Sequence, residues 1–114
     1  MTSKAIKDFN REFEAVRPHV YTRSRGRCET RCSPRCRGKG DQVHHRKLRA
    51  QGGTNDLVNL LHVCTPCHDA IHSAGEAAYQ AGLLVHGWDE VTPYTGQKLS
   101  RARGATEDTG RSPA

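Results

Sequence analysis

The apolar positions near the start of the chain recur every three or four residues, as on one face of a helix. They are Ile6, Phe9, Phe13 and Val16. We therefore predict an amphipathic helix over residues 3–16, capped by Ser3, with Pro18 just past its end. Because such patterns are common in packed helices, we assign this helix to packing rather than to function.

The middle of the chain changes to short apolar runs between turn-forming residues. Residues 24–42 are rich in arginine, glycine and cysteine and show no periodicity, so we expect an irregular loop there. The end of a short strand is expected at residues 42–45, followed by a glycine-marked loop at residues 46–56. Residues 57–63 are apolar enough for a second strand.

A second helix follows that strand. Thr65 is a good N-cap, and Pro66 suits the first helical position, where its missing N–H costs nothing. We expect this helix to end at Gly75, and a further short helix to span residues 76–81. A last short strand is expected at residues 83–85.

Length and polarity predict one small domain with a modest core. The chain has 114 residues, of which 34% are hydrophobic, and such chains often need a metal ion or disulfides as a staple. We divide it into an N-terminal helical segment at residues 1–19, a folded domain at residues 20–92 and a disordered tail at residues 93–114. Trp88 is expected to pack against the core.

The basic residues cluster between residues 23 and 49, and the formal net charge is +6. Net charge alone fits a nucleic-acid partner and ordinary solubility equally well, and the clustering favours nucleic acid. The chain shows no apolar run at its start and no apolar stretch of membrane-spanning length. We therefore expect a cytoplasmic protein without a membrane partner, whose cysteines are reduced.

Five cysteines offer a metal site. Cys64 and Cys67 form a C-x-x-C, and Cys28, Cys32 and Cys36 lie upstream. Two separated pairs suit a tetrahedral structural zinc ion, with Cys28 and Cys36 favoured upstream and Cys32 as the alternative. A redox pair would need a βαβ unit that the pattern lacks, and an odd count argues against closed disulfides. Unligated cysteines packed as small apolar side chains are the other alternative.

Four histidines form a second group. His68 and His72 are spaced i, i+4 on the second helix, so both imidazoles reach one metal ion, and His44 is the candidate third ligand. In a regular strand His45 points away from His44, which leaves it free to act as a general base. A single histidine is more often an ordinary surface residue, but four beside a C-x-x-C favour a site.

These motifs resemble the HNH endonucleases, in particular the small cysteine-containing members from tailed bacteriophages. The matching elements are Val43-His44-His45-Arg46, Gly52-Gly53, Asn55, Asn59-Leu60, Cys64-x-x-Cys67-His68, Ile71-His72 and Gly82-Leu83-Leu84-Val85-His86. The resemblance implies an α+β fold: a ββα-metal (His-Me finger) core around one divalent cation, here stapled by zinc and preceded by the N-terminal helix. The domain at residues 20–92 is then an HNH nuclease domain.

The resemblance also implies the role of each site residue. His45 is the general base, and Asn59 orients either the base or the loop between the strands. His44, His68 and His72 hold the catalytic cation, for which magnesium, manganese, nickel and zinc all stay open. The structural zinc stays with the cysteines.

The implied activity is hydrolysis of DNA phosphodiester bonds, leaving 5′-phosphate and 3′-hydroxyl ends. Arg46, Lys47 and Arg49 are expected to contact DNA phosphates. The resemblance places this activity in phage DNA processing or packaging, in the host cytoplasm, with packaging proteins such as terminase as partners. The alternative is a non-catalytic zinc-finger DNA-binding module, which would explain the cysteines and the charge but neither Asn59 nor His45. The oligomeric state, the cleavage sequence and the choice between nicking and double-strand cutting stay open.

Overall fold

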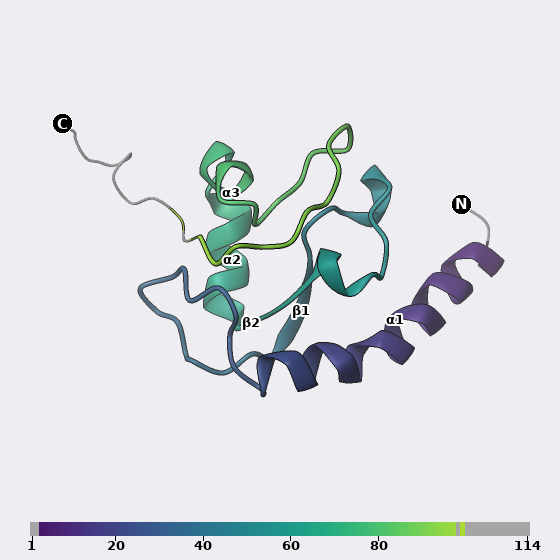
Figure 1. Cartoon of the computed structure of the whole chain (residues 1–114), viewed down its shortest axis with the longest axis horizontal. Helices are drawn as coiled ribbons and strands as arrows, with labels where there is room; N and C mark the ends of the chain where they lie inside the picture. Colours follow the sequence, from purple (N-terminus) through teal and green to yellow (C-terminus); the bar gives the residue numbers. More distant parts are fainter. Residues whose placement is uncertain (1–2, 98, 100–114) are drawn as a thin grey trace.

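A long N-terminal helix lies beside a two-stranded antiparallel sheet, and a shorter helix packs on the sheet (Figure 1). The computed structural model describes residues 3–97 and 99. The elements, in chain order, are α1 (Ser3–Ser24), β1 (Gln42–His45), the 3₁₀ turn η1 (Arg49–Gln51), the 3₁₀ turn η2 (Leu57–Asn59), β2 (Leu60–Val63), α2 (Thr65–Ser73) and α3 (Glu76–Gln80). This arrangement confirms the predicted α+β class. None of the helices in the described part is long and apolar enough to cross a membrane.

Helix α1 runs on to Ser24 with Pro18 inside it, whereas the sequence analysis ended it near residue 16. A proline inside a helix lacks the N–H for one backbone hydrogen bond, and its ring clashes with the carbonyl of the preceding helical turn. Tertiary contacts of the last turns outweigh this cost. Val20 is fully buried, and Arg23 donates to the carbonyls of Leu57 and Leu60 at 2.9 and 2.6 Å.

The sheet is short, and its second strand is fully buried. β1 pairs with β2 so that His44 lies opposite Leu61 and His45 opposite Leu60. β2 begins at Leu60 rather than at residue 57, because Leu57–Asn59 form the 3₁₀ turn η2. The Asn59 N–H donates to the Asp56 carbonyl at 2.8 Å, which closes this turn before the strand can start.

Helix α2 begins at Thr65, one residue earlier than predicted, because Cys64 rather than Thr65 is the N-cap residue. The Thr65 hydroxyl does not cap the helix. It accepts a hydrogen bond from Gln42 Nε2 at 2.7 Å and donates to Asp41 at 3.1 Å. The hydroxyl therefore ties α2 to the start of β1 instead.

The chain after α2 differs from the prediction in two places. α3 forms as expected, and Gly82 follows it with a φ of 76°, which suits glycine. Residues 83–85 are buried but form no strand, since the N–H of Val85 bonds to the Arg46 carbonyl rather than to a sheet. Trp88 is 80% exposed and stacks on His86 at 4.4 Å, so the expectation that it packs into the core is wrong.

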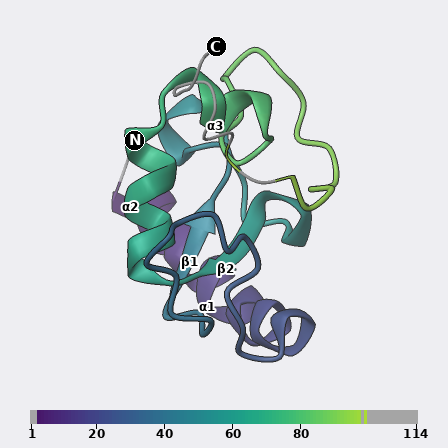
Figure 2. The ribbon, with the colours of Figure 1, turned by 90° about the vertical axis from the view of Figure 1, so that its left-hand side faces the viewer.

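The core lies where α2, α3 and the sheet meet. Its fully buried aliphatic side chains include Val63, Ile71 and Leu83, and buried cysteines join them. Val20 and Leu60 are also fully buried but are not part of this cluster. The loop at residues 25–41 folds across the start of α2 (Figure 2). Of the predicted tail, residues 98 and 100–114 lie outside the described residues, and Tyr94 packs against the core.

Candidate active site and metal centres

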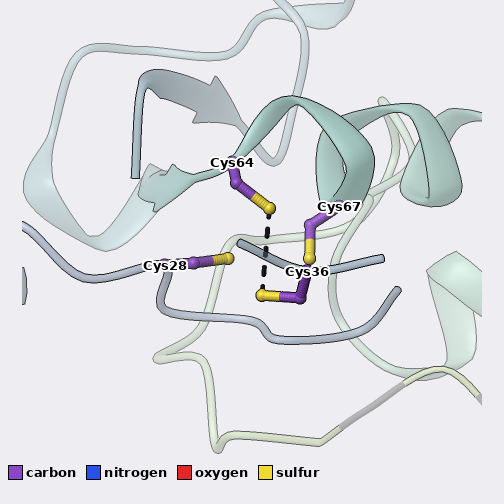
Figure 3. A group of neighbouring side chains, drawn as sticks. All are labelled: Cys28, Cys36, Cys64 and Cys67. Atoms are coloured by element: carbon purple, nitrogen blue, oxygen red, sulfur yellow. Dashed lines mark hydrogen bonds between the residues drawn. The ribbon is translucent and has the colours of Figure 1, made fainter. Parts of the chain in front are cut away.

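Four cysteines meet at the start of α2. The Sγ atoms of Cys28, Cys36, Cys64 and Cys67 all lie within 4.8 Å of one another. Cys64 and Cys67 come from the start of α2 and the other two from the loop at residues 25–41, and the sulfurs point toward one another (Figure 3). Cys36 and Cys64 are 3.8 Å apart. Zinc–sulfur bonds of about 2.3 Å in a tetrahedron place two sulfurs about 3.8 Å apart, so this group fits one zinc ion.

Backbone contacts close the loop that brings the upstream pair to the helix. The N–H of Cys28 donates to Gly38 at 3.0 Å, and an isolated bridge joins Arg27 to Lys39. Gly40 then passes against the imidazole of His62, where a Cβ would lie only 2.3 Å from the ring. A glycine at this position therefore lets the loop fold onto β2.

Cys32, the fifth cysteine, lies beside the group but is not one of the four. Its Sγ atom contacts the Thr30 hydroxyl at 3.6 Å and the Cys67 carbonyl at 3.7 Å. The structure thus brings Cys36 rather than Cys32 to the helix, which matches the favoured pair.

The acidities of the thiols differ within the group. Burial, aided by hydrogen bonding among the cysteines, raises the pKa of Cys36 to about 12. Burial also raises the pKa of Cys28, but hydrogen bonds from the backbone of Arg31 and Cys64 outweigh it and lower that pKa to about 6. Four thiolates need a cation to share this space, and the donor set therefore suits a thiolate-binding ion.

Three histidines form a second group, and two of them lie on α2. Ring nitrogens of His44, His68 and His72 lie within 4.8 Å of one another. His68 and His72 approach with their Nε2 atoms 3.2 Å apart. Metal–nitrogen bonds of 2.0–2.1 Å in a tetrahedron place two nitrogens about 3.3 Å apart. The i, i+4 spacing therefore brings the two imidazole nitrogens to a separation that one metal ion could bridge.

The surroundings of His44 leave one of its ring nitrogens available to bind a metal ion. It is 1% exposed, and its Nε2 lies 2.7 Å from the carbonyl of Leu83. Because a carbonyl only accepts, Nε2 carries the proton and Nδ1 carries the lone pair. Among the described residues, Nδ1 is the one buried side-chain N or O atom without a hydrogen-bond partner. Burial lowers the pKa of His44 to about 4, so the ring stays neutral and can bind a cation.

The histidine group opens toward solvent. His44 is buried, His68 is half-buried and His72 is exposed. Burial and the neighbouring His72 lower the pKa of His68. Open positions for water or a phosphate are what distinguish a catalytic metal site from a closed structural one.

His45 lies outside this group, on the opposite face of β1. Its ring packs against Phe9 and Phe13 of α1, with centroids 5.7 and 5.3 Å away. Its Nε2 lies 2.8 Å from Oδ1 of Asn55. Because side chains alternate along a strand, the adjacent residues His44 and His45 point to opposite faces of β1 and have different neighbours.

Asn59 holds the loop between the strands. It is 1% exposed. Its Oδ1 accepts from the N–H of Lys47 at 2.7 Å, and its Nδ2 donates to the carbonyls of Lys47 and Thr54 at 3.0 and 2.8 Å. All three bonds go to backbone on the two sides of one loop. Of the two roles considered for Asn59, this geometry matches the second.

Arg46 corrects the predicted set of DNA contacts. It is 3% exposed, and its guanidinium donates to the carbonyls of Gly82, Val58 and Thr92. The phosphate contact expected of Arg46 is therefore wrong, because its donors bind backbone inside the protein. Only two of the three predicted DNA contacts remain at the surface. Lys47 is half-buried and Arg49 is exposed, the latter with its guanidinium 5.2 Å from the Phe9 ring.

Residues 28–74 match the family model described as HNH endonuclease. This segment, which is less than half of the chain, is therefore similar to the HNH endonucleases. Comparisons with curated proteins and with solved structures gave no match. The matched segment runs from Cys28 to just past α2. It contains His45, Asn59 and both groups that could hold a metal ion. This similarity indicates a nuclease or DNA-binding function, with DNA as the substrate and a divalent metal ion.

Two partners of the site histidines, the Leu83 carbonyl and Asn55, were not predicted from the sequence. The Leu83 carbonyl, which bonds to His44, has no signature in the residue type, because any residue carries a carbonyl. Asn55, which bonds to His45, belonged to a recognised motif element but was taken only as part of a loop. A polar amide two residues after a glycine pair was the signal that could have identified it.

Proposed function

We propose that this protein is a metal-dependent endonuclease that hydrolyses DNA phosphodiester bonds, with the catalytic cation held by His44, His68 and His72. The observation that carries the proposal is the state of His44. Its Nε2–H is committed to the Leu83 carbonyl, and its buried Nδ1 is left beside the two helix histidines. A buried nitrogen lone pair without a partner costs free energy unless something binds it.

The second metal group has a structural role in this proposal. Cys28, Cys36, Cys64 and Cys67 would hold zinc in a closed tetrahedral site that secures the loop at residues 25–41 to α2. A non-catalytic zinc finger would need this group alone. The histidine group, with its exposed member, has no purpose in such a module.

His45 is the general base. A phosphodiester resists attack because both it and hydroxide are negatively charged, so the attacking water must lose its proton as it reacts. The imidazole accepts that proton while the water oxygen bonds to phosphorus and the bond to the 3′ oxygen breaks, and the leaving oxygen takes up a proton from solvent water. The products are a 5′-phosphate and a 3′-hydroxyl. When bound, the divalent cation supplies charge compensation at the phosphoryl group and the leaving oxygen.

Basic side chains around the site would hold the DNA backbone. Lys47 and Arg49 lie on the loop that follows β1. The exposed basic residues of the loop at residues 25–41 are Arg25, Arg27, Arg31, Arg35, Arg37 and Lys39. Such contacts give affinity and salt dependence without reading the sequence.

The biological setting that we propose is phage DNA processing or packaging in the host cytoplasm, with a terminase as partner. The support for this setting is the resemblance of the motifs to those of phage HNH proteins. The activity proposed above does not depend on it.

A plasmid-cleavage assay tests the proposed activity. We expect His45→Ala to lower the cleavage rate about 10²–10⁴-fold, the usual cost of losing a general base, with DNA binding unchanged. His19→Ala is the matched control, because His19 is exposed on α1. A wild-type protein that binds DNA but does not cut it with any of magnesium, manganese, nickel or zinc would favour the zinc-finger alternative. A His45→Ala variant that cuts within threefold of wild type would reject the role of His45.

A further inference from the structure

The buried side chain of Asn55 links the proposed general base to α1. Asn55 is 9% exposed and lies in the loop between η1 and η2. Its Oδ1 is 2.8 Å from Nε2 of His45, and its Nδ2 donates to the Phe9 carbonyl at 2.9 Å. Both ends of one amide are thus engaged, each by a group from a different element.

The second hydrogen bond determines the first. A backbone carbonyl only accepts, so the amide nitrogen of Asn55 must face Phe9 and the amide oxygen must face His45. An oxygen that only accepts requires a proton on Nε2 of His45. The imidazole is therefore in its Nε2–H form, and the lone pair available for a proton from water is on Nδ1.

The surroundings restrict the imidazole further. The rings of Phe9 and Phe13 lie at 5.7 and 5.3 Å from it and at interplanar angles of 30° and 42°. These contacts limit rotation of the imidazole about its Cβ–Cγ bond. Arg49 covers the Phe9 ring, so α1 and the loop after β1 pack together at this point.

α1 lies outside the segment that matches the HNH family, which begins at residue 28. Yet α1 provides the carbonyl that orients Asn55 and the rings that pack on His45. α1 itself is fixed at its far end, where Val20 is buried and Arg23 bonds to β2 and η2. The helix thus connects the base to a firm part of the fold.

We propose that Asn55 is a positioning residue that holds His45 in the Nε2–H tautomer and ties it to the backbone of α1, leaving Nδ1 as the basic nitrogen. This inference rests on the proposed role of His45. Asn59, by contrast, bonds only to backbone and holds the loop. The two asparagines therefore divide between them the two roles that the sequence analysis assigned to Asn59 alone.

The test measures the tautomer and the cleavage rate separately. Nitrogen-15 NMR of the His45 ring, assigned by its loss in His45→Ala, reports which nitrogen is protonated in the full-length protein. We expect the Nε2–H form in the wild type. In Asn55→Ala we expect a mixture of tautomers and a single-turnover cleavage rate about 10–100-fold lower at saturating DNA, as when other partners that orient site histidines are removed.

Two further variants separate positioning from general loop damage. Asn55→Asp keeps an oxygen acceptor for His45, so it should keep the Nε2–H tautomer even though it loses the bond to Phe9. Thr54→Ala is the loop control, because the exposed Thr54 hydroxyl contacts only Asp56, and it should match wild type in tautomer and rate.

The inference is overturned by an Nδ1–H tautomer in the wild type, whether or not the protein cuts DNA. It is also overturned by a folded Asn55→Ala variant that keeps the Nε2–H tautomer or cuts within threefold of an active wild type. A wild type that shows the Nε2–H tautomer without cutting DNA would reject the proposed function and leave the positioning of His45 supported. The tautomer measurement therefore keeps the two failures apart.

Discussion

The cysteine group and the histidine group share one helix but differ in how much of each is covered. Three of the four cysteines are buried, and the fourth is half-buried. Of the three histidines, one is buried, one is half-buried and one is exposed. Four donors in a covered space fit an ion that only holds structure, whereas three donors with an exposed edge leave room for a substrate. Burial and ligand number, rather than position in the sequence, thus distinguish the two sites.

The two groups are also adjacent along the chain. Cys67 and His68 are neighbours in the first turn of α2, yet they serve different groups because successive helical residues point about 100° apart.

Removing one cysteine ligand should have the largest effect. We expect Cys64→Ser or Cys67→Ser to unfold the domain, with loss of bound zinc. Structural zinc contributes about 10–16 kcal/mol of binding free energy in zinc-finger peptides, as much as the whole stability of a typical domain, about 5–15 kcal/mol. Zinc content and thermal melting by circular dichroism measure the result.

Cys32→Ser is the matched control for that experiment, since Cys32 lies beside the group without being one of the four. It should keep its zinc and melt like the wild type. A zinc-free Cys64→Ser variant that melts like the wild type would remove the case for a structural metal.

A chelator should remove the ion from the histidine site before it removes the ion from the cysteine site. The open histidine site exchanges its ion more readily than four thiolates do, so a titration with EDTA should abolish plasmid cleavage before it changes the circular dichroism spectrum. Adding a divalent ion at that stage should restore cutting. If activity and fold are lost together at one chelator concentration, the assignment of separate structural and catalytic ions does not hold.

Replacing Arg46 and Arg49 separately should distinguish an arginine that stabilises the fold from one that is exposed for contact with DNA. Replacing Arg46 with alanine removes a buried side chain and its hydrogen bonds to the carbonyls of Gly82 and Val58, and we expect a loss of about 2–4 kcal/mol in the free energy of unfolding. The exposed Arg49→Ala should change it by less than about 0.5 kcal/mol. Urea denaturation measures both, and equal losses would contradict the different placements of the two arginines.

The smallest expected effect concerns DNA affinity. Arg49→Ala and Lys47→Ala should each weaken DNA binding evenly across sequences and reduce the slope of log K against log salt by about 1. Fluorescence anisotropy over a series of salt concentrations measures this slope. Lys4→Ala, exposed near the start of α1, is the control. An unchanged slope for both loop variants would place the DNA elsewhere on the surface.

The parts of the site that sequence could predict are those set by local spacing. The C-x-x-C pair and the histidines at i, i+4 follow from the geometry of a helix start and one helical turn. The alternation of a strand likewise separated His44 from His45. In each case the relevant partners are a few residues apart, so the pattern itself carries the information.

What sequence could not predict depends on contacts between distant segments. Asn55 bonds to a carbonyl 46 residues away, and His44 to one 39 residues away. Arg46 was predicted to contact DNA together with Lys47, but its guanidinium donates to the distant carbonyl of Gly82. The continuation of α1 through Pro18 has the same origin, because contacts of Val20 and Arg23 with distant residues hold the last turns.

The shared helix has a consequence for how the two ions are taken up. We expect an ion at the proposed cysteine site to order the first turn of α2, so that His68 and His72 are already oriented when the second ion arrives. Binding at the two sites should then be positively cooperative, and by thermodynamic reciprocity the second ion should strengthen retention of the first by the same factor. A protein molecule that has its histidine site filled and its cysteine site empty should be rare. The concentration of available metal ions would thus determine how many protein molecules have both sites filled, rather than the activity of each such molecule.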